Sequence, residues 1–304
     1  MTLKNLDKAP FTYFGGKARL ADDIIALFPP HRVYIEPFFG SGAVFFAKRP
    51  ATHEIINDVD DAIVAFFRVL RDNPEGLEAA CRLSPFARAE YDACKTIGEG
   101  LDDLEKARRL YVRISQSFGK TGGSNTGWSR TVARTQSSPA SMLGRIGRFA
   151  TAAVRLADAT IEHTDACDLI EAMATDDTVV YADPPYLAAT RSMRSGNAND
   201  YRHDAGGAAF HERLAATLHA TPATVFLSGY PSDLYDRLYD GWDHVDFDVA
   251  CSASDGGRGE RARRVERVWS NRPIRSDPQL GLFDHTAAAG SIQGEPGVQF
   301  GGRL

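Results

Sequence analysis

Three short clusters in the chain combine residue types that could do chemistry. They are Tyr13–Lys17 (YFGGK), Glu36–Gly42 (EPFFGSG) and Asp183–Tyr186 (DPPY). Glycines directly after a strand let the backbone turn tightly and approach a ligand closely. A carboxylate beside two prolines and a tyrosine joins hydrogen-bond acceptors to an aromatic face. Together the clusters point to a site for nucleoside-like ligands.

Asp58 belongs with the second cluster by its spacing. It ends the next expected strand about 20 residues later, where a carboxylate can bind the two ribose hydroxyls of a nucleoside cofactor. The turn lacks the full G-x-G-x-x-G pattern, so it gives only weak support for a dinucleotide. A glycine turn that simply connects two elements is the alternative.

The third cluster has the features of a rigid acceptor corner. Its two prolines fix the backbone φ angle and supply carbonyls without competing N–H groups. Asp183 and a backbone carbonyl can accept hydrogen bonds from an amino group, and Tyr186 offers an aromatic face. A base turned out of a duplex fits this description. A plain Pro-Pro turn is the alternative, and it is disfavoured because all three clusters occur in order.

Strand and helix patterns alternate along the chain and place the clusters at strand ends. Apolar runs predict strands at Arg32–Glu36, Glu54–Asp58, Ala159–His163, Thr178–Ala182, Ala223–Leu227, His244–Val249 and Val265–Trp269. Helical spacing predicts helices at Asp60–Arg71, which Pro74 stops, and at Ala208–His219 and Ser232–Tyr239. This alternation predicts an α/β domain with a largely parallel sheet. Residues 75–157 interrupt it as an inserted helical subdomain, and residues 272–304 are expected to form a flexible tail.

The composition fits a folded protein of a reducing compartment. The 304 residues are 43% hydrophobic and 25% charged, which argues against a disordered or fibrous chain. The chain has no run of about 18 apolar residues and no apolar signal core near its start, so neither a membrane span nor secretion is expected. Four cysteines without CxxC spacing disfavour disulfides and a metal site.

Basic residues are concentrated in one stretch, although the net charge of the chain is −5. Between Lys106 and Leu156 lie ten Lys and Arg residues and no Asp or Glu. Helices in this stretch would lack Glu for i,i+4 pairing. The one-sided charge therefore predicts a surface for phosphates, with a solvated basic face as the alternative.

Taken together, YFGGK, EPFFGSG and DPPY resemble motifs X, I and IV of Dam-like DNA adenine-N6 methyltransferases in the alpha arrangement. The pattern Arg261…Val265-Glu266…Trp269-Ser270-Asn271 is similar to the ending of phage and bacterial members, so the resemblance spans about residues 10–271. It implies a Rossmann-like class I methyltransferase fold with helices on both faces of a mixed, mostly parallel sheet. It also implies a catalytic domain of residues 1–74 and 158–271 and a DNA target-recognition subdomain of residues 75–157.

The resemblance implies S-adenosyl-L-methionine as cofactor and a flipped adenine in double-stranded DNA as target, in the cytoplasm of a bacterial cell or a phage-infected host. The residues that would bind the cofactor are Tyr13, Lys17, Glu36, Phe38, Gly40, Gly42, Asp58, Asp165 and Asp183. The catalytic residues would be Asp183, Pro184, Pro185 and Tyr186. No metal is needed, because the methyl group on the sulfonium is already activated.

The loop Gly119–Thr131 is a candidate DNA contact because it joins glycines to basic, amide and aromatic side chains. The expected DNA-binding residues are Arg113, Lys120, Asn125, Trp128, Arg130 and Arg134. A surface loop without a partner is the alternative. Two further segments, Ser192–Tyr201 and Ser252–Arg264, could also meet DNA, although an exposed β-hairpin explains the second equally well.

Gln279–Phe283 (QLGLF) resembles the peptide by which bacterial proteins dock on the sliding clamp, and a chance match is the alternative. Two other functional classes stay open. One is a methyltransferase for the cytosine amino group, RNA or protein glutamine. The other is a DNA-binding module without catalysis, against which the intact YFGGK and DPPY clusters argue.

Overall fold

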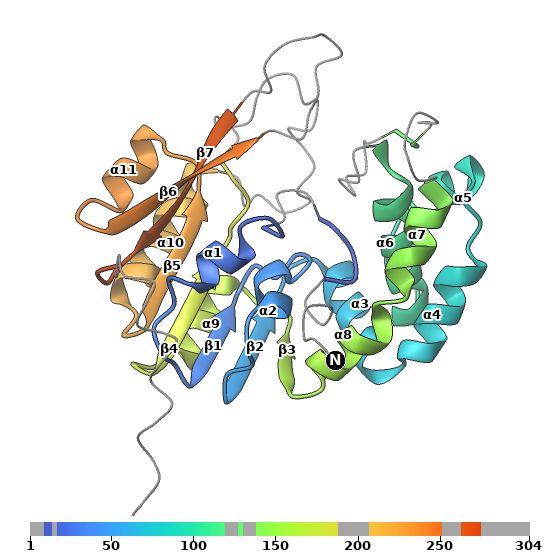
Figure 1. Ribbon diagram of the computed structural model, residues 1–304, viewed down its shortest axis with the longest axis horizontal. Helices are drawn as coiled ribbons and strands as arrows, with labels where there is room; N and C mark the ends of the chain where they lie inside the picture. Colours follow the sequence, from blue (N-terminus) through green and yellow to red (C-terminus); the bar gives the residue numbers. More distant parts are fainter. Residues whose placement is uncertain are drawn as a thin grey trace, which may run out of the picture. The chain divides into compact units, whose positions relative to one another are not determined.

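The computed structural model describes residues 9–13, 17–118, 127–129, 138–187, 207–250 and 263–274. Within them a seven-stranded sheet forms the centre of the fold (Figure 1). The strands are β1 (Val33–Glu36), β2 (His53–Asn57), β3 (Ala159–Glu162), β4 (Thr178–Ala182), β5 (Thr224–Gly229), β6 (Asp243–Ala250) and β7 (Arg263–Ser270). All the strands that the apolar runs predict are present. The chain divides into two units, Met1–Ile274 and Arg275–Leu304, and the second lies outside the described residues.

The strand order is β3-β2-β1-β4-β5-β7-β6. Strands β1 to β5 run parallel to one another, whereas β7 runs antiparallel to both β5 and β6. A mixed, mostly parallel sheet in this order is consistent with the class I methyltransferase fold, so the predicted fold class is confirmed. The antiparallel direction of β7 matters for the site, because its first residues lie at the edge where the parallel strands end.

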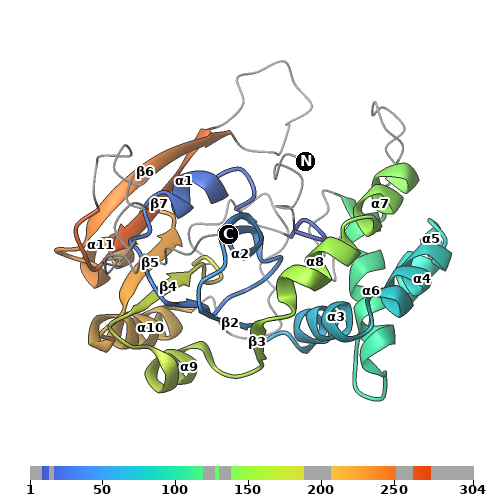
Figure 2. The ribbon, with the colours of Figure 1, turned by 60° about the horizontal axis from the view of Figure 1, so that its bottom comes forward.

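Helices cover both faces of the sheet, as predicted. They are α1 (Ala21–Ile25), α2 (Ala43–Ala47), α3 (Asp61–Asp72), α4 (Pro74–Leu83), α5 (Arg88–Ala93), α6 (Asp103–Gln116), α7 (Ser138–Ile146), α8 (Phe149–Leu156), α9 (Ala166–Met173), α10 (Ala208–Ala220) and α11 (Asp233–Leu238). Figure 2 shows α9 and α10 on the side of the sheet opposite to α1 and α2. None of the helices in the described ranges is long and apolar enough to cross a membrane.

Successive residues of each central strand face opposite sides, which builds two separate cores. In β4, Val179 and Tyr181 join the core under α1, α2 and α3, while Val180 and Ala182 join the core under α9, α10 and α11. In β7, Val268 and Trp269 divide in the same way. Burial on both faces explains why these strands appear in the sequence as continuous apolar runs.

Helices α3 to α8 gather beside β3 (Figure 1). Helix α3 packs against α6 and α8, and Phe66 of α3 contacts Tyr111 of α6 and Phe149 of α8 with ring centroids 6.4 and 5.7 Å apart. The core on the α3 side of the sheet therefore continues into the helices of residues 75–157. The division of the chain into a catalytic and a target-recognition part stays a prediction.

Pro74 has a different role from the one expected. It does not only end the helix before it; it begins α4, where a missing N–H costs nothing. Asn73 lies between the two helices, and its side chain caps α4 by accepting a hydrogen bond from Gly76 N at 3.1 Å. One Asn-Pro pair therefore ends α3 and starts α4 without a loop.

Candidate active site

The carboxyl ends of the parallel strands bring the sequence clusters to one edge of the sheet. Glu36 is the last residue of β1, Asp58 follows β2 directly, and Asp183 follows β4 directly. Strands β2, β1 and β4 are neighbours in the sheet. Open α/β sheets bind ligands outside the carboxyl ends of their strands, so this edge is the candidate active site.

Lys17 joins the first cluster to the third. Its Nζ atom donates to Asp183 Oδ1 at 2.6 Å and to the Tyr186 hydroxyl at 2.5 Å. Glu266 of β7 completes the group, because its Oε1 accepts from the Tyr186 hydroxyl at 2.5 Å and lies 3.3 Å from Lys17 Nζ. We call these four residues the Lys17 cluster. The side chain of Asp183 is 21% exposed, whereas Lys17 is 5% exposed, so a ligand can reach the carboxylate.

The Lys17 cluster holds one cation between two acids. Burial would lower the pKa of Lys17, but the charges of Asp183 and Glu266 overcome this and raise it above its usual value. Burial raises the pKa of Asp183 and of Glu266, and the Lys17 ammonium opposes both increases. Lys17 therefore stays protonated and favours the ionised, hydrogen-bond-accepting form of Asp183.

The glycine turn after β1 needs its glycines. Gly40 and Gly42 have φ angles of +51° and +67°, in the left-handed region that favours glycine. A Cβ atom at Gly42 would overlap the Phe39 ring, so a larger residue would also clash. A Cβ atom at Gly40 would lie 3.5 Å from Tyr13, which places the first cluster against this turn.

Asp58 is fixed by the same turn. Its Oδ2 accepts from Gly40 N at 2.8 Å, and its Oδ1 accepts from Asp60 N at 2.9 Å. Burial raises the pKa of Asp58 to about 7. Burial also raises the pKa of Glu36 to about 8, although Glu36 accepts a hydrogen bond from the Tyr34 hydroxyl at 2.8 Å. Both acids would be stabilised as carboxylates by a ligand that donates hydrogen bonds.

Asn57, at the end of β2, ties the neighbouring loops together. Its Nδ2 donates to Pro37 O at 3.0 Å and to Thr164 O at 3.1 Å, and its Oδ1 accepts from Thr164 N at 2.9 Å. Sequence reasoning missed this residue. A buried amide that ends an apolar strand is the signal that could have found it, because such a group must find partners in nearby loops.

Two other predicted cofactor residues have structural contacts of their own. Phe38 packs edge-on against Phe210 of α10, with ring centroids 6.1 Å apart. Asp165 caps α9, because its Oδ1 accepts from Cys167 N at 2.9 Å and its Oδ2 accepts from Arg213 at 3.0 Å. A cofactor contact with the Asp165 carboxylate would have to compete with these bonds.

Glu266 is the residue of the Lys17 cluster for which the sequence predicted no role. It belongs to the strand pattern VERVWS, and its side chain is 7% exposed. One charged residue on the inward face of an apolar strand is a signal for a buried partner. The partners could not be named from the sequence, since Lys17 and Tyr186 are distant in the chain.

Trp128, a predicted DNA contact, packs against the helices. Its ring lies 5.7 Å from that of Phe86, and its Nε1 donates to Gln116 Oε1 at 3.2 Å. Arg113 is 4% exposed in α6, so its side chain lies inside the helical part. Phe118, which sequence reasoning did not select, is 61% exposed beside residues 119–126. Lys120, Asn125, Arg130 and Arg134 lie outside the described residues.

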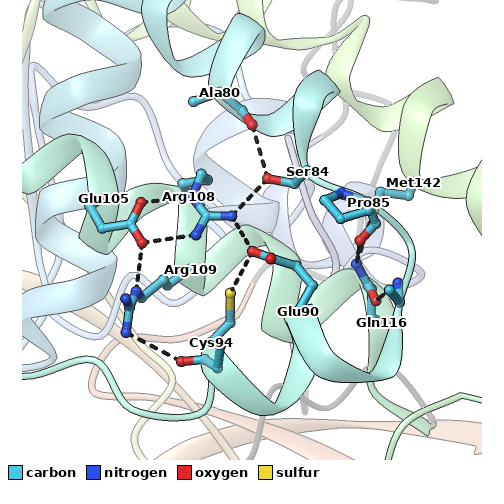
Figure 3. A network of polar contacts seen from close by, with 12 residues as sticks. Ala80, Ser84, Pro85, Glu90, Cys94, Glu105, Arg108, Arg109, Gln116 and Met142 are labelled. Atoms are coloured by element: carbon cyan, nitrogen blue, oxygen red, sulfur yellow. Dashed lines mark hydrogen bonds and ion pairs between the residues drawn. The ribbon is translucent and has the colours of Figure 1, made fainter.

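Arg108 and Arg109 of the basic stretch pair with acids of the described helices (Figure 3). Arg108 donates to Glu90 at 2.5 Å, to Glu105 at 2.7 Å and to Ser84 at 2.9 Å. Arg109 donates to the same Glu105 at 2.7 Å. The expectation that helices of this stretch lack i,i+4 pairing was therefore wrong, because Glu105 lies just before the stretch and pairs into it.

Two more basic side chains of the stretch pair with distant acids. Lys106 donates to Asp61 at 2.7 Å, and Arg155 forms a bidentate pair with Glu54, including a 2.8 Å bond to Oε1. Arg148 donates to a backbone carbonyl, Ala9 O, at 3.2 Å. Charge counting along the sequence therefore overstates how much of this stretch is available to phosphates.

Comparisons with known proteins agree with the fold. Residues 13–247 match the family model of the D12 class N6 adenine-specific DNA methyltransferases. A DNA adenine methylase of Haemophilus influenzae is 34% identical over 84 residues, which are 27% of this chain and 29% of the relative. The modification methylase StsI of Streptococcus sanguinis is 25% identical over 201 residues, which are 64% of this chain and 31% of the relative.

A type II methyltransferase of Lactococcus lactis subsp. cremoris is 40% identical over 70 residues, which are 22% of this chain and 24% of the relative. The chain thus spans less than a third of the length of each of these relatives. The family model, in contrast, covers most of this chain, from the first cluster past the third. The chain therefore belongs to the family of D12 class N6 adenine-specific DNA methyltransferases.

Proposed function

We propose that the chain transfers the methyl group of S-adenosyl-L-methionine to the exocyclic amino group of a flipped adenine in double-stranded DNA, at a specific site. The observation that carries this proposal is the contact of Lys17 with Asp183, which joins YFGGK to DPPY across the chain. The contact holds the Asp183 carboxylate, which a ligand can reach, beside the Tyr186 ring at the carboxyl edge of the sheet. Membership of the family supports both the cofactor and the adenine target.

The donor and acceptor set of the edge fits this cofactor. Asp58, held by the glycine turn, would accept the ribose hydroxyls, and Tyr13 lies against the same turn. Glu36, Phe38, Gly40 and Gly42 would surround the methionine part, and Asp165 would lie near the adenine. When bound, S-adenosyl-L-methionine supplies a methyl group that its sulfonium centre already activates.

Asp183 would orient the target amine. The lone pair of this amine is delocalised into the adenine ring, so the amine is a poor nucleophile. Hydrogen bonds to Asp183 and to the Pro184 carbonyl would favour a pyramidal nitrogen with its lone pair directed at the methyl group. Tyr186 would stack on the base, and Pro185 would keep the corner rigid. Positioning contributes most of the rate in such a direct transfer, and Asp183 stabilises the positive charge that develops on nitrogen.

DNA binding is proposed for the loop Gly119–Thr131 and the residues next to it. The residues proposed to contact DNA are Lys120, Asn125, Trp128, Arg130 and Arg134. Arg113 is not proposed again as a contact, because its side chain is buried in the helical part. Turning the base out of the duplex costs a few kcal/mol. The exposed ring of Phe118, at the base of this loop, could offset part of this cost by contacting the disturbed stack.

Substitution Asp183→Ala tests the proposal. The variant should lose methylation by at least about 100-fold, because it removes the group that orients the amine. DNA binding, measured by fluorescence anisotropy, should largely survive. The assay follows methyl transfer from labelled S-adenosyl-L-methionine to unmethylated genomic DNA, with product nucleosides separated by chromatography. Equal loss of DNA binding and methylation in a folded variant would contradict the role of Asp183, and N4-methylcytosine as product would contradict the adenine target.

We also propose that the protein acts in the cytoplasm of a bacterial cell or of a phage-infected host, where the DNA that it would methylate lies. Two of the relatives are a type II methyltransferase and a modification methylase. A role in modification beside a restriction enzyme is proposed on that basis.

Docking of Gln279–Phe283 on the sliding clamp is a separate proposal. This segment lies outside the described residues, and a pull-down that compares Phe283→Ala tests it.

A further inference from the structure

The direction of β7 brings Glu266 to the site. Strand β7 runs antiparallel to β5, and Arg267 pairs with Gly229, the last residue of β5. Glu266 therefore lies one residue beyond that end, at the edge where β4 delivers Asp183. Its side chain faces the same side of the sheet as Val268, toward α1. An acid in this place is 7% exposed and meets Lys17 and Tyr186.

The Tyr186 hydroxyl accepts one hydrogen bond in the Lys17 cluster and donates another. A Tyr hydroxyl has one proton to donate. The Tyr186 hydroxyl accepts from Lys17 Nζ at 2.5 Å and donates to Glu266 Oε1 at 2.5 Å. Burial and the charges of Asp183 and Glu266 raise the pKa of Tyr186 well above its usual value, so the hydroxyl keeps its proton with both carboxylates close to it. Without Glu266, the proton of Tyr186 would be donated to Asp183 and would compete with the target amine.

We propose that Glu266 is a positioning residue: it holds the Tyr186 hydroxyl and shares the Lys17 ammonium, and so keeps Asp183 available to the substrate amine. It acts through Tyr186 and Lys17 and touches no substrate. The ring of Tyr186, whose centroid lies 4.5 Å from that of Tyr230, is then fixed at both its hydroxyl and its face. This inference rests on the proposed function for the identity of the substrate.

Three substitutions separate the charge of Glu266 from its hydrogen bond. Glu266→Gln keeps an acceptor for Tyr186 but removes the negative charge near Lys17. Glu266→Ala removes both, and Glu266→Asp keeps the charge on a shorter side chain. Asp246→Asn is the matched control, because Asp246 is a carboxylate of the neighbouring strand β6. It pairs at 2.6 Å with Arg267, whose side chain lies on the face of β7 opposite to Glu266.

The first readout is methyl transfer to unmethylated genomic DNA. We expect kcat to fall between about 10- and 100-fold in Glu266→Ala, with a smaller decrease in Glu266→Gln, because misplacement of an orienting group slows transfer by such factors. KM for S-adenosyl-L-methionine should change by less than about threefold, and Asp246→Asn should match the wild type. A decrease of kcat in Asp246→Asn as well, or an unchanged kcat in folded Glu266→Ala, would overturn the proposal.

The second readout is a double-mutant cycle with Tyr186→Phe, which removes the hydroxyl and keeps the ring. Since Glu266 acts through that hydroxyl, Glu266→Ala should cost much less in the Tyr186→Phe background than in the wild type. Equal costs in both backgrounds would show a merely structural role and overturn the proposal. Absence of methylation by the wild-type protein would instead count against the proposed function. In that case the same cycle, read as the free energy of unfolding in urea, still tests whether Glu266 and Tyr186 are coupled.

Discussion

Single residues at the carboxyl edge titrate away from their usual ranges because the sheet and its loops bury them. Burial disfavours the charged form of an acid, which raises the pKa of Asp58 to about 7 and that of Glu36 to about 8. Ligand groups that donate hydrogen bonds would reverse part of this increase. The site is therefore adapted to a ligand that carries hydroxyls and a positive charge, and its affinity should depend on pH.

Asp58 gives the sharpest pH prediction. The carboxylate accepts hydroxyl hydrogen bonds better than the protonated acid, so the affinity for 5′-methylthioadenosine should rise as pH increases from about 6 to about 8. This probe has the ribose but no ammonium group. Titration calorimetry at several pH values should show a flat profile for Asp58→Asn. Glu36→Gln is the control, since the probe lacks the methionine part, and a flat profile in the wild type would contradict the role of Asp58.

The residues of the site were predictable to the extent that they follow parallel strands. Asp58 and Asp183 end apolar runs whose carboxyl ends must share one edge, so their proximity follows from the topology. The place of Glu266 did not follow, because it depends on the antiparallel register of β7. The packing of Trp128 on Phe86 also depends on contacts that no local pattern contains.

At the scale of elements, a buried ion pair fastens helix α8 to the sheet. Arg155 of α8 pairs with Glu54 of β2, which also accepts from Lys48 at 2.5 Å. The Arg155 guanidinium lies 3.8 Å from the centre of the Phe45 ring in α2. Burial alone would raise the pKa of Glu54, but its bonds to Arg155 and Lys48 lower it. The pair therefore joins α8 to α2 and β2, although Arg155 and Glu54 lie 101 residues apart in the chain.

Substitution Arg155→Ala should lower the free energy of unfolding by up to about 3 kcal/mol, because Glu54 stays buried with less compensation. The lowered pKa of Glu54 means that its stabilisation is present above the unfolded value of about 4.5 and disappears as pH falls through the folded value. Urea denaturation should therefore show a weaker acid dependence in the variant. Arg68→Ala breaks an exposed pair with Asp103 and should cost less than about 1 kcal/mol.

Elements were predicted better than their connections. Apolar runs flanked by polar residues located the central strands, since both faces of the sheet are covered there. The edge strand β6 was located by its alternation of polar and apolar residues instead. Pro74 was correctly predicted to follow the end of a helix, but its second role as the first residue of α4 was not foreseen, because a proline serves equally in both places. The ion pairs of the basic stretch were not foreseen, because their acids lie as far as 101 residues away in the chain.

At the scale of the whole molecule, the distribution of charge decides how DNA would be bound. The net charge is −5, and the described basic side chains Lys106, Arg108, Arg109 and Arg155 are paired with acids. Attraction of phosphates must then come from the other basic residues of the stretch. Long-range attraction should be modest, and interactions close to the DNA should dominate.

The salt dependence of DNA binding tests this distribution. Joint substitution of Lys120, Arg130 and Arg134 by Ala should lower the slope of log K against log salt by roughly 0.9 for each phosphate that the variant no longer neutralises. Joint substitution of Lys106 and Arg109 should leave the slope unchanged and reduce stability instead. Anisotropy titrations between 50 and 300 mM salt, roughly the range over which such slopes are resolved, measure both. A reduced slope in the second variant would show that the paired charges also reach DNA.

The antiparallel strand β7 has a consequence for synthesis of the protein. Lys17 is made early and Glu266 late, so the ribosome must pass residue 266 before the four side chains can meet. A nascent chain halted before that point would hold the glycine turn and the acid–diproline corner but would not yet hold the acceptor that Lys17 and Tyr186 share. Assembly of the Lys17 cluster at the carboxyl edge is thereby coupled to the synthesis of β7. Under the proposed function, a newly made chain would reach full activity only after β7 has joined the sheet.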